Sequence, residues 1–272
     1  MSQKKEGKFM LPDSQTLPND DSRDIQSQLK PHIKHAIHGK LYRWAGTQVR
    51  DKAVLDAGCG TGYGPAILAK TAQRVVAIDH DPQIIAGANA AFARPNVEFM
   101  VMDCESMAFD ADSFDVVVCS ALLEYLRDVP AFIAEVHRVL KANGLFICGT
   151  KNLQLSLKNA DGTPRYRNHR QEFDPDGLKG LLAGYFSDIE ISGERMKTRS
   201  EAYIMNEPAL KIEDFLVRLG VKKLFPRTVR DRVRALITGV ELGEISHDDF
   251  EITEGLAHDA LYIVGLGVKA NH

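Results

Sequence analysis

The residues with the clearest chemical potential are a run of alternating glycines and three aspartates. The glycines stand at positions 58, 60, 62 and 64 of the segment VLDAGCGTGYG, and Asp56 precedes them. Asp79 and Asp103 each follow a later apolar run. Glycine lets the backbone approach a ligand closely at positive φ angles, and a carboxylate accepts hydrogen bonds from hydroxyl and amino groups. This combination predicts a site for a nucleotide-sized ligand.

The spacing of the glycines narrows the choice of ligand. A dinucleotide fingerprint has the pattern G-x-G-x-x-G, which no three of these glycines form. Asp56 would also be a poor neighbour for a pyrophosphate, although it can accept hydrogen bonds from a cationic amino group. A ligand with an ammonium group and a ribose but no phosphate therefore fits better. Asp79 can then take the ribose hydroxyls, and Asp103 can accept from an exocyclic adenine amine.

Short strands must position these residues. Five β-branched or aromatic-rich apolar runs alternate with amphipathic stretches, and most of them lack strict polar alternation, as in strands buried on both faces. They comprise residues 53–57, 74–79, 96–101, 114–120 and 144–150, and further candidate strands follow at 188–192 and 260–268. The predicted fold class is α/β, a Rossmann-like doubly wound sheet of seven mostly parallel strands with helices on both faces.

Helix starts lie between the strands. Asp81-Pro82, Asp128 with Pro130, and Asp174-Pro175 each place an N-cap before a proline, and Asn143-Gly144 is expected to end the second of these helices. Apolar residues from 25 to 41 recur at helical spacing, with Pro31 expected to kink or split that helix.

The domain organisation follows from these elements. Residues 1–20 are predicted to be a flexible tail, and 21–272 to be a single domain. Within the domain we expect entry helices at 21–50, a cofactor-binding core at 51–195, a helical lid inserted at 196–255 and the last strand at 256–272. The lid contains a basic stretch, 211–234, with eight Lys or Arg against three acids, and an acidic stretch, 241–259, with seven acids. The two stretches are expected to neutralise each other in part, and the alternative is that the basic stretch receives an anionic substrate or makes peripheral contact with a membrane surface.

Composition excludes several classes. The 272 residues are 44% hydrophobic and 26% charged with a net charge of −3, which argues against a disordered chain and against a global basic surface for nucleic acid. No apolar run is long enough for a transmembrane segment and no signal peptide is evident, so a cytoplasmic location is expected. The four cysteines form no C-x-x-C pair, so no metal site is predicted and they are interpreted as buried hydrophobes.

The motifs together resemble a known family. VLDAGCGTGYG, VVAID, MDCESMAFDADSFDVVVCSALLEYL and VHRVLKANGLF look like a class I S-adenosylmethionine-dependent methyltransferase, and most closely like its type 11, small-molecule branch. The resemblance is strong over residues 38 to 192. It implies S-adenosyl-L-methionine as cofactor, S-adenosyl-L-homocysteine as product and a small-molecule acceptor.

The resemblance also implies cofactor-binding residues. Around the methionine part it places Tyr42 on an entry helix that closes over the cofactor, the carbonyl of Ser120, and the loop residues Asp56, Gly58, Cys59, Gly60 and Gly62. Around the adenosine it places Asp79, His80, Asp103 and Cys104. Tyr125 departs from the family, in which many relatives carry His at this place, so no role is transferred to it.

His169 is the candidate catalytic residue. It lies in NHRQEF, after the fifth predicted strand, and relatives often show a similar segment before the next helix. Histidine is a common general base for an oxygen nucleophile. Glu172 is close enough in sequence to orient its ring, although methyl transfer can also proceed by alignment alone.

Several functions stay open at this point. The acceptor oxygen or nitrogen could belong to a sugar, a lipid or a natural product, and the oligomeric state is not defined. A protein that binds S-adenosylmethionine without turnover is one alternative. A nucleic-acid or protein methyltransferase is another, although residues 120–123 read SALL where amino-methylating DNA enzymes have Asn/Asp-Pro-Pro-aromatic.

Overall fold

The computed structural model describes residues 31–155, 168–197, 247–255 and 262–270, together with residues 258 and 260. Their centre is an eight-stranded sheet in the order β3-β2-β1-β4-β5-β8-β6-β7. The strands are β1 (Ala53–Ala57), β2 (Arg74–Asp79), β3 (Val97–Val101), β4 (Phe114–Ser120), β5 (Leu140–Lys151), β6 (Ser187–Met196), β7 (Phe250–Glu254) and β8 (Tyr262–Val268).

The direction of the strands defines where a ligand can bind. Strands β1 to β5 are parallel, whereas β8 lies antiparallel between β5 and β6, and β7 pairs antiparallel with the outer side of β6. The chain order reverses between β1 and β4, which are neighbours in the sheet. In an open α/β sheet, ligands bind beyond the carboxyl ends of the strands at such a reversal.

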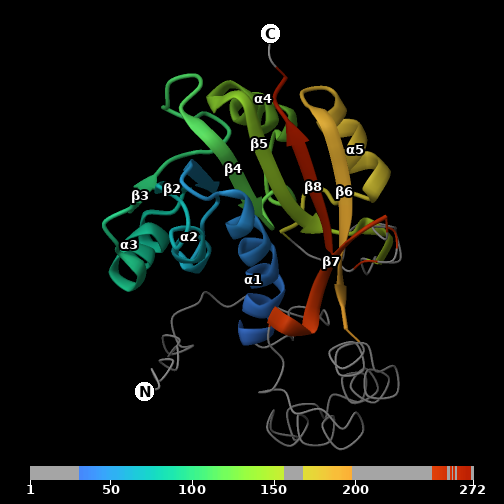
Figure 1. Cartoon of the computed structure of the whole chain (residues 1–272), viewed down its shortest axis with the longest axis horizontal. Helices are drawn as coiled ribbons and strands as arrows, with labels where there is room; N and C mark the ends of the chain where they lie inside the picture. The colour runs from blue at the N-terminus through green and yellow to red at the C-terminus, as the bar shows by residue number, and fades with distance from the viewer. Residues whose placement is uncertain are drawn as a thin grey trace, which may run out of the picture.

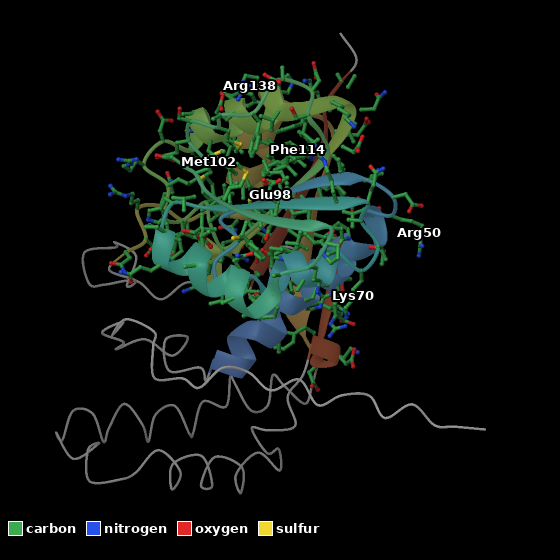
Figure 2. The ribbon with its side chains drawn as sticks, turned by 90° about the vertical axis from the view of Figure 1, so that its left-hand side faces the viewer. Arg50, Lys70, Glu98, Met102, Phe114 and Arg138 are labelled. Atoms are coloured by element: carbon green, nitrogen blue, oxygen red, sulfur yellow. The ribbon has the colours of Figure 1, made fainter. Side chains whose placement is uncertain are left out.

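Helices cover both faces of the sheet. α1 (Pro31–Gln48), α2 (Tyr63–Leu68) and α3 (Pro82–Phe92) lie on one face, and α4 (Val129–Val139) and α5 (Pro175–Ala183) lie on the other. Figure 2 shows the strands between α4 and the helices of the first face, with Phe114 and Met102 on the α4 side and Lys70 on the other. Two 3-10 turns, at Leu153–Leu155 and His247–Asp249, complete the described elements.

The starts of α3, α4 and α5 follow the sequence prediction. The side chains of Asp81, Asp128 and Asp174 each accept a hydrogen bond from the first turn of α3, α4 and α5. α1 begins at Pro31, which suits a first helical position because proline has no N–H to donate. These caps fix where each helix leaves the carboxyl edge of the sheet.

The two faces hold separate hydrophobic layers. Between the sheet and α4 and α5, the rings of Phe132 and Phe146 lie edge to face with centroids 6.2 Å apart, and both are fully buried. Between the sheet and α1 and α2, Leu41, Ala45 and Val49 pack on the strands. The central strands therefore bury apolar side chains on both faces, which explains why they lack polar alternation.

Replacing Phe132 by Ala is expected to lower the free energy of unfolding by about 3–5 kcal/mol, because the side chain is fully buried and its loss leaves a cavity. Urea denaturation followed by circular dichroism measures the change. Val101→Ala is the matched control, because Val101 is 53% exposed and should cost far less. A cost for Phe132→Ala as small as that of the control would contradict this packing.

The predicted α/β class is confirmed, but two details of the prediction differ. The sheet has eight strands rather than seven, because residues 250–254, placed by the sequence in a helical lid, pair with β6 and bury Phe250. α4 ends at Val139 rather than at Asn143, because the chain joins β5 directly at Leu140. Residues 1–20, residues 198–246 and with them the basic stretch 211–234 lie outside the described residues.

Candidate functional site

The glycine loop connects β1 to α2 at the reversal of strand order. Its backbone takes left-handed conformations at Gly58 (φ +72°), Gly60 (φ +51°) and Gly62 (φ +88°), which explains the need for glycine. The N–H groups of Gly58 and Cys59 both donate to the carbonyl of Ile78, each at 2.9 Å. The loop is thereby held against the end of β2.

The middle of this loop faces open space. A Cβ atom built on Gly58 would lie 2.7 Å from Cδ1 of Leu122, and one on Gly62 would lie 2.8 Å from Cβ of Ala88. At Gly60, in contrast, no heavy atom of the described residues lies within 4 Å of such a Cβ. The loop therefore packs closely on its own chain at both ends and leaves room beside its centre.

Asp79, at the end of β2, connects the loop to the start of α3. Its Oδ2 accepts from the N–H of Gly60 at 3.1 Å, and its Oδ1 accepts from the N–H of Asp81 at 3.1 Å. The ring nitrogen Nδ1 of His80 lies 3.2 Å from the same Oδ1, although 84% of the His80 side chain is exposed. The carboxylate is thus fixed in orientation beside the open centre of the loop.

Asp56 is fully buried at the end of β1 and is contacted from α1. The hydroxyl of Tyr42 donates to the carboxylate, with Oη 3.0 Å from Oδ1 and 3.2 Å from Oδ2. Burial raises the pKa of Asp56 to about 8, the hydrogen bond from Tyr42 opposes this shift, and the charge of Asp79 adds to it. The ring of Tyr42 lies directly over Gly64, where a Cβ would approach to 2.3 Å of Cζ. α1 is therefore seated on the glycine loop.

Asp103 lies after β3 and is half exposed. Its Oδ1 accepts from the N–H of Glu105 at 2.9 Å, and its Oδ2 lies 3.2 Å from a guanidinium nitrogen of Arg127. Cys104 beside it is buried. Arg127 was not singled out from the sequence, because its position gave no sign that it reaches the loop after β3.

Ser120, the last residue of β4, lies on the face covered by α1. Its Oγ is 3.3 Å from Nδ1 of His38, and the ring of His38 meets the ring of Tyr262 edge to face at 5.4 Å. Ala121 follows in a left-handed conformation (φ +51°), so the chain turns sharply at the end of the strand. His38 and Tyr262 are thus brought to the predicted methionine end of the site by α1 and β8.

His169 lies between a carboxylate and a phenol. Its Nδ1 is 2.8 Å from Oε1 of Glu172, and its Nε2 is 3.3 Å from Oη of Tyr125. The side chains of His169 and Glu172 are 7% and 0% exposed, whereas Tyr125 is about half exposed. The sequence indicated the Glu172 contact but not Tyr125, because 44 residues separate Tyr125 from His169.

Glu124 anchors the segment that carries His169. The N–H of Arg170 donates to the backbone carbonyl of Glu124 at 2.8 Å, and the Glu124 side chain accepts from the N–H of Lys151 at 2.8 Å. The amide of Gln171 also donates to the carbonyls of Leu123 and Leu126. Burial raises the pKa of Glu124 above its ordinary value. These bonds hold His169 at the carboxyl ends of β4 and β5.

The cysteines and the acidic residues form no metal centre in the described part of the chain. No group of three or more His, Cys, Asp or Glu side chains is arranged there to hold a metal ion. The four cysteines are buried and free, and burial raises the pKa of Cys148 to about 12. Nor is any helix among the described residues long and apolar enough to span a bilayer.

Comparison with known proteins shows what this chain is similar to. Residues 55–148 match a family described as a methyltransferase domain. A Mycobacterium tuberculosis relative, named a "probable S-adenosylmethionine-dependent methyltransferase", is 33% identical over 158 residues, which are 57% of this chain and 56% of the relative. The ubiquinone biosynthesis O-methyltransferase of Methylocella silvestris is 30% identical over 115 residues, 42% of this chain and 45% of that one.

The fold agrees with solved structures. An S-adenosylmethionine-dependent methyltransferase from Mesorhizobium loti matches with a TM-score of 0.52 at 16% identity, over 87% of this chain and 100% of that one. The mostly parallel sheet is Rossmann-like, and residues 55–148 are the part of the chain that is similar to a methyltransferase domain. The chain spans little more than half the length of the Mycobacterium tuberculosis relative and under half the length of the Methylocella silvestris relative.

Proposed function

We propose that this protein transfers a methyl group from S-adenosylmethionine to an oxygen atom of a small-molecule acceptor, with His169 as the general base. The observation that carries the proposal is the pair of contacts on the His169 ring. Glu172 accepts at Nδ1, and Nε2 is directed toward the hydroxyl of Tyr125. A carboxylate at Nδ1 favours the tautomer whose proton is on that nitrogen, so Nε2 is left able to accept a proton.

The residues of the cofactor site fit the cofactor. The open centre of the loop at Gly60 leaves room beside the backbone, and the Asp79 carboxylate is oriented next to it. We infer that Asp79 with His80 holds the ribose side and Asp103 with Cys104 the adenine. We also infer that the methionine part is held by the remaining candidates, Tyr42, Asp56, Gly58, Cys59, Gly60, Gly62 and Ser120. The cofactor supplies a methyl group on a sulfonium, which is a strongly activated leaving group.

The need for a base favours an oxygen acceptor. A hydroxyl must lose its proton as the new bond forms, whereas a neutral amine can attack with its lone pair and lose its proton later. Glu172 and Tyr125 fix the direction of Nε2, so His169 accepts a proton at a defined position. The O-methyltransferase name of the Methylocella silvestris relative agrees with this choice.

The proposal is tested by acceptor profiling. Purified protein with S-adenosylmethionine is incubated with libraries of sugars, lipids, phenols and amines while S-adenosylhomocysteine formation is followed. Turnover with hydroxyl acceptors supports the proposal, and turnover confined to amines overturns the choice of oxygen. Cofactor binding without turnover on any library would favour a protein that only binds S-adenosylmethionine. Methylation of oligonucleotides or proteins, included as further substrates, would overturn the small-molecule acceptor.

Affinity for S-adenosylhomocysteine is expected to rise with pH in a way that depends on Asp56. The Asp56 pKa of about 8 means that the carboxyl is protonated near pH 6 in the free protein. An ammonium group binds the ionised carboxylate, so binding must release a proton below pH 8, and affinity can rise up to about tenfold per pH unit. Calorimetry at pH 6, 7 and 8 should show this rise in the unmodified protein and a much flatter profile for Asp56→Asn.

The raised pKa of Asp56 also predicts that the cofactor-free protein becomes less stable as pH rises, whereas the affinity for S-adenosylhomocysteine increases. Between about pH 4 and pH 8 the folded protein keeps an Asp56 proton that the unfolded chain has lost, so this contribution to stability is lost as pH rises through 8. Asp56→Asn should therefore gain stability relative to the unmodified protein from pH 5 to pH 9 in urea denaturation. A constant difference across this range would contradict the raised pKa.

A further inference from the structure

A second group of polar side chains lies on the α1 face beside the predicted methionine end of the site. Glu194 on β6 is the register partner of Tyr262 on β8, so their side chains stand next to each other on one face of the sheet. Val264, two residues after Tyr262, packs against α1, which identifies this face. In Figure 1, the lower part of α1 lies beside β7.

The group is connected to the cofactor site by short contacts. The ring of Tyr262 meets His38 at 5.4 Å, and Nδ1 of His38 is 3.3 Å from Oγ of Ser120. Burial, and after it the charge of Glu124, raises the pKa of Tyr262 above its ordinary value. Tyr262 is therefore connected through His38 to the predicted methionine end of the site.

Glu194 is the unusual member of the group. It is only 3% exposed, and its Oε1 has no hydrogen-bond partner among the described residues. A buried polar atom without a partner costs free energy, so such an atom beside a reaction site is an indication of a ligand contact. Burial raises the pKa of Glu194 well above its ordinary value, and the charge of Lys40 opposes the shift only in part.

We propose that Glu194, Tyr262 and His38 form the acceptor-binding part of the site and select a neutral, hydroxyl-rich acceptor such as a sugar. The inference rests on the proposed function and adds the substrate class. A protonated carboxyl donates one hydrogen bond and accepts another, as neighbouring hydroxyls require. An ammonium acceptor would meet Lys40 and the sulfonium charge of the cofactor, so a neutral acceptor is favoured.

The test uses protein saturated with S-adenosylhomocysteine and three probes: methyl α-D-mannopyranoside, ethanolamine and 4-methylphenol. Saturation-transfer NMR titrations give the affinity of each. We expect the mannoside to bind, Glu194→Leu to weaken it at least about tenfold, and Glu194→Gln to change it less than about threefold because an amide also donates and accepts. Tyr262→Phe, which alters only one hydroxyl, should weaken it several-fold. Glu190→Gln, at an exposed position of the same strand, is the matched control and should change nothing.

The outcomes separate the two proposals. Failure of S-adenosylhomocysteine to bind overturns the proposed function itself. If it binds and the mannoside does not, or if Glu194→Leu and Tyr262→Phe leave mannoside affinity unchanged, the acceptor assignment is wrong. Ethanolamine binding that is lost in Glu194→Gln would instead identify a site for a cation and would overturn the neutral acceptor. Preferential binding of 4-methylphenol, unaffected by Glu194, would likewise overturn it.

Discussion

His169→Gln is expected to lower the rate of methyl transfer by about 10²–10³-fold while leaving the affinity for S-adenosylhomocysteine unchanged, the usual scale for losing a positioned base. Glutamine keeps the approximate size and polarity of the side chain but cannot take up the proton. The measurement is single-turnover formation of S-adenosylhomocysteine with a hydroxyl acceptor identified by profiling, together with calorimetric binding of the product cofactor.

Variants of the residues that contact His169 test whether its ring must be held in one orientation. Glu172→Gln should lower the rate by about tenfold or more, because the ring loses the carboxylate that fixes its tautomer. Tyr125→Phe tests the contact at Nε2 without changing the ring that packs against His169 at 5.0 Å. His137→Gln is the matched histidine control, since His137 lies in the last turn of α4 with its ring against Tyr185 and Phe186. A loss of less than fivefold in His169→Gln would assign His169 a structural role and leave catalysis to alignment.

Asp79→Ala is expected to weaken S-adenosylhomocysteine binding by roughly 1–3 kcal/mol, which is about 5- to 150-fold, the cost of losing charge-assisted hydrogen bonds. Two effects combine in this variant. The ribose hydroxyls lose their acceptor, and the N–H of Gly60 loses the bond that holds the glycine loop beside β2. Isothermal titration calorimetry at fixed pH measures the change, with NADH as a ligand that should not bind.

The control for Asp79→Ala is Glu98→Gln, which removes an exposed acidic side chain from β3 (Figure 2). Its affinity should equal that of the unmodified protein. Asp79→Asn keeps one carbonyl oxygen for the loop, so its affinity should fall between those of Asp79→Ala and the unmodified protein. Tight binding of NADH, or undiminished S-adenosylhomocysteine binding in Asp79→Ala, would contradict the assignment of the cofactor site.

Local sequence determined the strands and the loop of this protein. β1, β2 and β4 have the bounds that the apolar runs predicted, because buried parallel strands need continuous β-branched residues and little else in the sequence shares that pattern. The glycine loop could also be predicted from the sequence, since three of its four glycines have positive φ angles that other residues rarely adopt. The aspartate caps of α3, α4 and α5 are local hydrogen bonds, so they could also be predicted from the sequence.

Contacts between segments that lie far apart in the sequence could not be predicted from local patterns. β7 is short and its partner β6 lies more than fifty residues earlier in the chain, so the sequence around Phe250 carried no sign of the pairing. The same holds for the contacts of Tyr42 with Asp56, of Arg127 with Asp103 and of Tyr125 with His169. Each joins side chains from different elements, and their distances depend on how the helices cross the sheet.

The sequence by itself determined the α/β class, the cofactor loop and the residue types at the strand ends, because these depend on local conformation and on periodicity. Only the tertiary structure decided which of those residues meet. It buried Asp56 and raised its pKa, placed Tyr125 at the second nitrogen of His169, and set Glu194 beside Tyr262. Burial and charge are properties of the folded surroundings of a side chain, so the chemistry of the site depends on packing that no single segment encodes.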